Sequence, residues 1–261
     1  MRIILLTLLL LTLISLSPCL AGSPAVLFDQ GHGQAFTIEK QGELQLGKLA
    51  DTFRASGWQV ASSTHPFSDA LLANVDALVI SGAFKALDAK ELAAVGKFLN
   101  RGGRLAVMLH IAPPMVELLG KLGVASANGV VRESNTALIL DEQPLNFKVT
   151  DLQYHPLTRN LDSFSLYGGW PLMPIGKNAR AIAQTSSAAW VDLNNDDIQS
   201  LKDAMQAFAV IVTGTVGKGE FTVFADDAIF QNRFLTGTNK TLADNLSRWM
   251  MRGRTQSGVD I

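Results

Sequence analysis

The stretch that decides the fold is AVLFDQGHGQAF, residues 25–36. It begins with the apolar residues 26–28, which fit a strand buried on both faces of a sheet. The polar residues that follow are separated by Gly31 and Gly33, and glycine permits the positive φ angles of a tight loop. In open α/β sheets, ligands bind where such loops leave the carboxyl ends of the strands. The stretch therefore predicts the first strand of an α/β sheet, followed by a ligand-binding loop.

His32, between the two glycines, has two interpretations. In the first, its imidazole lines a cleft, because little side-chain bulk shields it, and Asp29 accepts a hydrogen bond that raises its pKa. In the second, it caps a neighbouring element. We expect the first, in which His32→Ala weakens binding at a nearly unchanged melting temperature. A structural histidine predicts the opposite result, a loss of about 1 kcal/mol or more of stability.

The N-terminal residues fit a signal peptide. Arg2 precedes the apolar run 3–16, which is too short for a comfortable membrane span, and residues 19–21 offer small side chains where a signal peptidase cuts. We expect cleavage of residues 1–21 and a periplasmic or secreted protein that starts at Gly22. A lipid anchor on Cys19 is the lesser alternative, because Pro18 fits a lipidation site poorly.

Charge and cysteine content exclude several classes of protein. The chain has 22 basic and 23 acidic residues, and this balance gives no sign of a nucleic-acid partner. Cys19 is the one cysteine, so cleavage would remove both any disulfide framework and any thiol nucleophile. No other apolar run approaches membrane length, so we expect no membrane insertion after cleavage.

The first half alternates apolar strands with helical segments. Strands are expected at 26–28, 58–61, 76–80 and 104–109, and helices at 43–56, 88–99 and 113–122. This alternation predicts an α/β fold with a doubly wound, mostly parallel sheet and right-handed crossovers. The strands at 26–28, 77–80 and 105–109 should be parallel neighbours, with helices on both faces.

The second half is less regular. From residue 130 to 191 the segments are short and interrupted by prolines. Residues 208–213 and 220–225 are expected to form an antiparallel hairpin near the C-terminus. Its connection, GTVGKG at 214–219, lacks the spacing of a phosphate-binding loop and is interpreted as a turn. A helix at 239–251 completes a single domain, 22–254, and 255–261 is a frayed tail.

Four short motifs together resemble an exported family of unknown function. They are Leu27-Phe28-Asp29 with His32, Gly102-Gly103 before a strand, His155-Pro156-Leu157-Thr158, and Phe224-Ala225-Asp226-Asp227 with Asn232 and the helix carrying Asn245, Leu246 and Trp249. The resemblance implies the class I glutamine amidotransferase-like, or flavodoxin-like, fold. It also implies kinship with auxiliary components of gliding-motility-type ABC transporters. The HPLT motif is similar to one in the trehalose-utilisation branch of this fold.

The resemblance also argues against enzymatic activity of the usual kind. Enzymes of this fold carry a nucleophilic cysteine after a central strand, and the matching residues here are His110-Ile111-Ala112-Pro113. They include no cysteine or serine, and Pro113 has no amide N–H for an oxyanion pocket. Amidotransfer by a thiol is therefore excluded, and a pseudoenzyme is expected.

Polar side chains that follow the expected strands form the candidate ligand site. The set comprises Asp29, His32, Gln34, Ser81, His110, Asp226 and Asn232. Two imidazoles with carboxylates could bind zinc, but no pair has HxH or HExxH spacing, so we expect neither metal nor cofactor.

Several nearby residues have structural interpretations. His65 and His155 precede prolines and are expected to stabilise turns. Asp227 is expected to cap a turn, whereas Asp226 is either a functional carboxylate or a second cap. Tyr167 and Trp170 could stack on a sugar, but packing of a loop against the sheet is favoured.

The expected function is non-catalytic binding of a small ligand, with a saccharide as one option, or of an envelope protein partner linked to an ABC transporter. One alternative is a hydrolase that uses histidine and aspartate residues of the cleft, with or without a metal. The other is a scaffold with a vestigial cleft.

Overall fold

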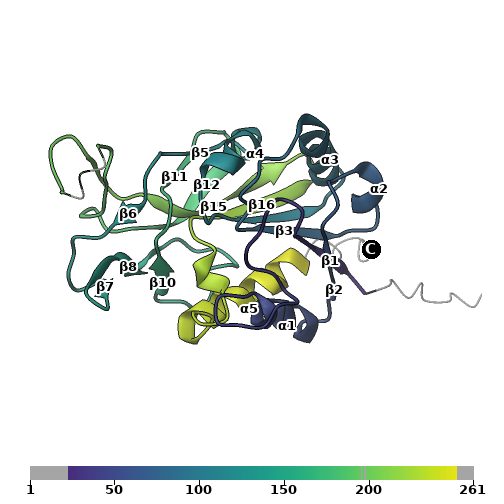
Figure 1. Ribbon diagram of the computed structural model, residues 1–261, viewed down its shortest axis with the longest axis horizontal. Coiled ribbons are helices and arrows are strands. Elements are labelled where there is room, and N and C mark those ends of the chain that lie inside the picture. Colours follow the sequence, from purple (N-terminus) through teal and green to yellow (C-terminus); the bar gives the residue numbers. More distant parts are fainter. Residues whose placement is uncertain (1–22, 195, 197, 252–261) are drawn as a thin grey trace, which may run out of the picture.

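The computed structural model describes residues 23–194, 196 and 198–251. Its centre is a ten-stranded mixed sheet whose main path runs β2-β1-β3-β4-β16-β15-β11-β5 (Figure 1). The strands of this path are β1 (Ala25–Asp29), β2 (Gln59–Ser63), β3 (Ala77–Ser81), β4 (Arg104–Met108), β5 (Val124–Ser126), β11 (Leu172–Pro174), β15 (Ala209–Val216) and β16 (Gly219–Phe224). The expected signal peptide and frayed tail lie outside the described residues.

The parallel half of the sheet has the strand order 2-1-3-4-5 of flavodoxin-like folds, with β16 as its fifth strand. The neighbours β1, β3, β4 and β16 are parallel, which confirms the predicted arrangement of the first, third and fourth strands. Strand β3 is buried along its whole length, as its continuous apolar sequence predicts. At the edge, β2 is only partly buried, because one side of it has no neighbouring strand among the described residues.

The other half of the sheet is antiparallel. Strands β15 and β16 form the predicted hairpin, and β15 also pairs with β12 (Ala179–Gln184), which in turn pairs with β9 (Asp151–Leu152). Two small three-stranded sheets flank this half. They contain β7 (Ile139–Leu140), β8 (Gln143–Val149) and β10 (Phe164–Tyr167), and β6 (Val131–Arg132), β13 (Trp190–Val191) and β14 (Ala204–Met205).

Helices cover both faces of the central sheet (Figure 1). One face carries α2 (Asp69–Leu72), α3 (Ala89–Asn100) and α4 (Val116–Lys121), and the other carries α1 (Gly47–Ala55) and α5 (Gly237–Met251). Short 3-10 helices lie at Pro113–Met115 and Ala228–Phe230. None of the helices in the described part of the chain is both long and apolar enough to cross a membrane.

Local sequence explains why α3 begins where it does. The Asp88 side chain accepts hydrogen bonds from the backbone N–H groups of Lys90 and Glu91, and Glu91 accepts one from the backbone of Asp88. This reciprocal capping box satisfies N–H groups that a helix start would otherwise leave unpaired. It also fixes the Glu91 carboxylate at the carboxyl edge of the sheet, where it contacts the loop after β1.

Candidate functional site

The parallel strands bring several predicted residues to one edge of the sheet. Asp29 and Ser81 end β1 and β3, His110 lies two residues beyond β4, and Asp226 and Asp227 follow β16. Because these strands are parallel neighbours, their carboxyl ends lie along the same edge. At this edge the polar residues separate into a half-exposed group around His110 and a buried group around His32.

The centre of the half-exposed group is the pair His110 and Asp227. The Nδ1 atom of His110 lies 3.0 Å from Oδ1 of Asp227, whose side chain is completely buried, whereas the His110 side chain is 37% exposed. The hydrogen bond from Asp227 raises the pKa of His110, burial opposes this rise, and the charges of Asp227 and Asp226 add to it. In the described part of the chain the other ring nitrogen, Nε2, has no hydrogen-bond partner.

Aromatic side chains surround the His110 ring. Its centroid lies 5.3 Å from that of Phe36 and 5.2 Å from that of Phe84, and the Phe84 side chain is itself exposed. The indole Nε1 of Trp170 donates a hydrogen bond to the His110 backbone carbonyl over 3.0 Å. Phe36, Phe84 and Trp170 thus hold the imidazole in place and border it with apolar surface.

Two buried polar atoms beside this pair lack partners among the described residues. They are Oγ of Ser81 and Oδ2 of Asp227. Gly82 allows the close packing, because its φ is +61° and a Cβ there would lie 2.5 Å from Asp227 Oδ2. Buried polar atoms normally have hydrogen-bond partners, so these two atoms mark a place for water or a ligand group. We call Ser81, Gly82, His110 and Asp227, with Phe36 and Phe84, the carboxyl-edge site.

His32 is buried, so the expectation that it lines a cleft is wrong. Only 4% of the residue is exposed. Its Nδ1 lies 2.8 Å from Asp29 Oδ2 and its Nε2 lies 3.0 Å from Glu91 Oε1, so both ring nitrogens are occupied. Its ring also packs against Phe67 with centroids 5.1 Å apart. The two flanking glycines do not expose it, because α3 and the residues before α2 cover it.

Opposing effects act on the pKa of His32. Burial lowers it, but the hydrogen bond and charge of Asp29, followed by those of Glu91, raise it more, so the net direction is upward. Gln34 belongs to the same group: it donates to Asp29 Oδ2 over 2.5 Å and accepts from the His32 backbone N–H. We call Asp29, His32, Gln34 and Glu91 the buried histidine cluster. It ties the β1 loop to α3.

Asp226 and Asp227 have roles opposite to those expected for a cap and a site residue. The Asp226 carboxyl group accepts the backbone N–H groups of Tyr167 and Ala228, which is a capping role. The Asp227 side chain makes no capping hydrogen bond, so its interpretation as a turn cap is wrong. Burial, together with the charge of Asp227, raises the pKa of Asp226 to about 8.

Asn232 lies apart from the carboxyl-edge site. Its side chain accepts the Lys48 backbone N–H and donates to the Gly42 carbonyl, so it connects the start of α1 to the segment before α5. His155 is buried and accepts the Leu157 N–H in its own turn, as expected of a turn residue. Among the residues that the structure describes, no three His, Cys, Asp or Glu side chains form a group suited to a metal ion.

Two expected packing roles involve aromatic residues of the loop after β10. Tyr167 stacks on Phe234 with ring centroids 4.0 Å apart, and the Trp170 backbone bonds to Ala225 at the end of β16. Both residues therefore pack the loop, as favoured from the sequence. The sequence reasoning missed Glu91, Phe36 and Phe84 as neighbours of the site. The spacing of Asp88 and Glu91 marks a capping box, and it was the only local signal for Glu91.

Comparison with known proteins adds a family. The family model described as "Domain of unknown function (DUF4350)" matches residues 43–246, most of the chain. The chain belongs to this family. No protein with a curated description is significantly similar to it in sequence.

Solved structures share the fold at low sequence identity. The mmIFT52 N-terminal domain is 19% identical, with a TM-score of 0.69 over 90% of this chain and 100% of that one. A ThuA-like protein from Bacteroides uniformis is 15% identical, with a TM-score of 0.55 over 91% and 96% of the two chains. A GMP synthase protein from Thermoplasma acidophilum is 11% identical, with a TM-score of 0.54 over 91% and 98%. These similarities confirm the class I glutamine amidotransferase-like fold.

Proposed function

We propose that this DUF4350 domain binds a small ligand at the carboxyl-edge site without catalysing a reaction. One observation carries the proposal. The half-exposed His110 imidazole is fixed through Nδ1 by the buried Asp227, and its Nε2 has no partner in the described part of the chain. A ring held in this way is ready to donate or accept one further hydrogen bond.

The surroundings favour a saccharide as the ligand class. The raised pKa of His110 favours the protonated ring, which donates from Nε2 to a hydroxyl or carboxylate oxygen. The rings of Phe36 and Phe84 offer apolar surface beside this donor. A sugar presents both groups that this combination requires, namely hydroxyl oxygens and a C–H face. Phe84 supplies the exposed part of the apolar surface.

The absence of a nucleophile supports binding rather than covalent catalysis. The turn after β4, residues 110–113, contains no thiol or hydroxyl side chain, and Ser81 Oγ is buried. A hydrolase remains the second candidate, because a carboxylate that orients a histidine is the arrangement of a general base acting on water. The His110 and Asp227 geometry is the observation that favours it.

The experiment compares wild-type protein with His110→Gln in thermal-unfolding assays against a panel of saccharides. A ligand that binds only the native state at 100 times its Kd stabilises that state by about 2.7 kcal/mol. We expect this shift for the wild type and its loss in His110→Gln. The matched control is His65→Gln, which changes an exposed histidine in the turn after β2. Equal shifts in wild type and His110→Gln would contradict the proposal.

The same samples separate the two candidates. Chromatography of the saccharide after prolonged incubation shows whether any glycosidic bond has been cut. An intact ligand supports binding alone, whereas cleavage by wild type that is lost in His110→Gln supports the hydrolase. If no saccharide shifts the melting curve, a scaffold role is favoured instead.

Export and a partner in the cell envelope are part of the proposal. The basis for export is the pattern of residues 1–21, and the basis for a link to an ABC transporter is the motif resemblance alone. Crosslinking in cells followed by identification of the captured proteins tests the partner. Recovery of ABC transporter components with the wild type would support it.

A further inference from the structure

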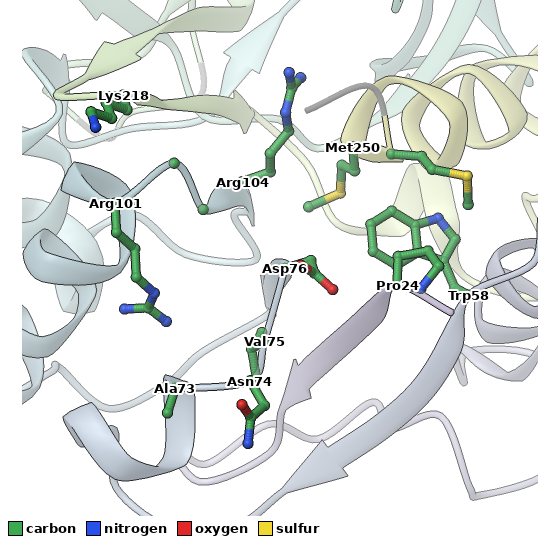
Figure 2. A pocket seen from close by; sticks show the side chains of 13 residues that line it. Pro24, Trp58, Ala73, Asn74, Val75, Asp76, Arg101, Arg104, Lys218 and Met250 are labelled. Atoms are coloured by element: carbon green, nitrogen blue, oxygen red, sulfur yellow. The ribbon is translucent and has the colours of Figure 1, made fainter. Parts of the chain in front are cut away.

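A cavity of about 530 Å³ lies at the amino edge of the sheet, opposite the carboxyl-edge site. It is enclosed by the starts of β1, β3 and β4, by the turn between β15 and β16, and by the end of α5 (Figure 2). Its volume is within the range of small-molecule sites, which is about 300 to 1,000 Å³. None of the residues proposed above for ligand binding lines it.

Basic side chains dominate the charged lining of this cavity. Arg101, Arg104 and Lys218 contribute cations, and Asp76 contributes a carboxylate. Figure 2 shows Arg101 and Lys218 along one side, with Asp76 toward the side of Pro24 and Trp58. Arg104 forms an ion pair with Glu220 just outside the cavity, and Asp76 accepts the Ala25 backbone N–H over 2.8 Å. Arg101 and Lys218 therefore supply positive charge that no acidic side chain of the described residues pairs with.

The two arginines are held in place by contacts that leave donors unused. Arg101 donates to the Leu72 carbonyl, and its guanidinium lies 5.1 Å from the ring centroid of Phe98. Arg104 donates to the Trp249 carbonyl and lies 5.0 Å from the Trp249 ring. A guanidinium has five N–H donors, so Arg101 retains several for a ligand. Lys218 has no ion-pair or hydrogen-bond partner among the described residues and adds an ammonium group on the same side.

Glycines place Lys218 beside Arg101. The turn between β15 and β16 packs so closely on the loop between α3 and β4 that a Cβ at Gly219 would lie 2.5 Å from the carbonyl oxygens of Gly103 and Leu99. Lys218 also packs on Gly102, whose φ is +110°. The sequence GTVGKG is thus a hairpin turn, and its close packing fixes the position of its lysine.

We propose that the amino-edge cavity is a second ligand site, which takes a small organic oxyanion. An arginine fork and a lysine point charge are the groups that bind phosphate and carboxylate oxygens. The Trp58 ring and the Met250 side chain form an apolar wall for the organic part of the ligand. The inference is independent of the function proposed for the carboxyl-edge site.

Calorimetric titration with pyrophosphate and with citrate, in low-salt buffer free of other polyanions, tests the inference. We expect at least one probe to bind, and the double variant Arg101→Gln/Lys218→Gln to weaken it by about tenfold or more. The preferred probe tells a phosphate ligand from a carboxylate ligand. The matched control, Lys121→Gln/Arg180→Gln, removes two exposed cations outside the cavity and should change the Kd less than about twofold.

Lys218→Gln alone guards against misfolding of the double variant, because Lys218 is an exposed turn residue. It should weaken binding by about threefold or more while the melting temperature stays unchanged. The inference is overturned if neither probe binds the wild type, or if the control loses as much affinity as the double variant. It is also overturned if His110→Gln abolishes probe binding, since the anion would then bind at the carboxyl edge.

Discussion

The Nε2 atom of His32 lies 3.0 Å from Oε1 of Glu91, a residue 59 positions further along the chain. The same Glu91 oxygen accepts the Phe67 backbone N–H, and its other oxygen accepts that of Asp88. One carboxylate therefore joins the β1 loop, the segment before α2 and the start of α3. Because these three segments border the carboxyl edge, the buried histidine cluster is part of the frame of the site and not its ligand contact.

His32→Ala should therefore destabilise the protein. The substitution leaves the Asp29 and Glu91 carboxylates buried without their shared cation, and breaking such a buried pair costs about 3 kcal/mol or more. Urea denaturation of the variant, with the exposed His65→Ala as its control, measures the loss. A midpoint equal to that of the control would show that the cluster carries no stability.

Asp226 should make the protein less stable as pH rises from about 4 to about 8. Burial, with the charge of Asp227, raises its folded pKa from an ordinary value near 3.8 to about 8, so the folded state holds a proton that the unfolded state has lost. This contribution to stability is fully present below the unfolded pKa and is lost as pH rises through the folded pKa. Melting temperatures measured across pH 4 to 9 should fall less steeply in Asp226→Asn. Parallel profiles for the two proteins would contradict the assignment.

Gly82→Ala should disconnect His110 from Asp227. A Cβ at Gly82 would lie 2.5 Å from Asp227 Oδ2, so the carboxylate must move. Since the hydrogen bond from Asp227 is the main cause that raises the pKa of His110, that pKa should fall toward its ordinary value. An NMR titration of the imidazole signals measures the change. The control Gly57→Ala has a φ of +94° at an open position, so it adds backbone strain and leaves the titration unchanged.

Gly219→Ala should destabilise the contact between the β15–β16 turn and the α3–β4 loop. Its Cβ would lie 2.5 Å from two backbone oxygens, which cannot rotate away, and overpacking of this kind costs about 1 to 3 kcal/mol. Gly96→Ala is the matched control within α3, because nothing lies within 4 Å of its Cβ. It should stabilise the helix by about 1 kcal/mol through helix propensity. Denaturation curves of opposite shift for the two variants would confirm both.

The exported protein should begin at Gly22 and carry no lipid. The pattern of Arg2, the apolar run 3–16 and the small residues at 19–21 leads to this expectation. Intact-mass spectrometry of the protein recovered from the exported fraction decides it. A mass that includes a diacylglyceryl group on Cys19 would contradict it, and so would an uncleaved N-terminus.

The sequence predicted the elements whose signal is local. Strands β1, β3 and β4 are continuous apolar runs because helices cover both faces of the sheet there, and that pattern is readable without a partner. The short strands between residues 130 and 191 depend on distant partners, and nothing in their own residues reveals the pairing. For this reason the parallel half was predicted in detail and the antiparallel half only as its terminal hairpin.

The candidate site was predicted in the same uneven way. His110 was found because it follows a buried strand, a local signal. Asp226 and Asp227 look alike in sequence, and which carboxylate meets His110 is decided by the direction in which each leaves the end of β16. His32 was misjudged because the residue that covers it, Glu91, comes from a helix that the local sequence does not connect to the β1 loop.

The pairing of β4 with β16 also sets an order of events for the newly made chain. His110 and Asp227 are 117 residues apart, so during synthesis β4 emerges long before the strand that will lie beside it. Until then the nascent sheet ends in the unpaired backbone of an apolar strand, which other chains can join. A truncation that ends before β15 would therefore be expected to aggregate rather than to fold into a smaller domain. The strand that completes the site is also the one that closes this edge to other chains.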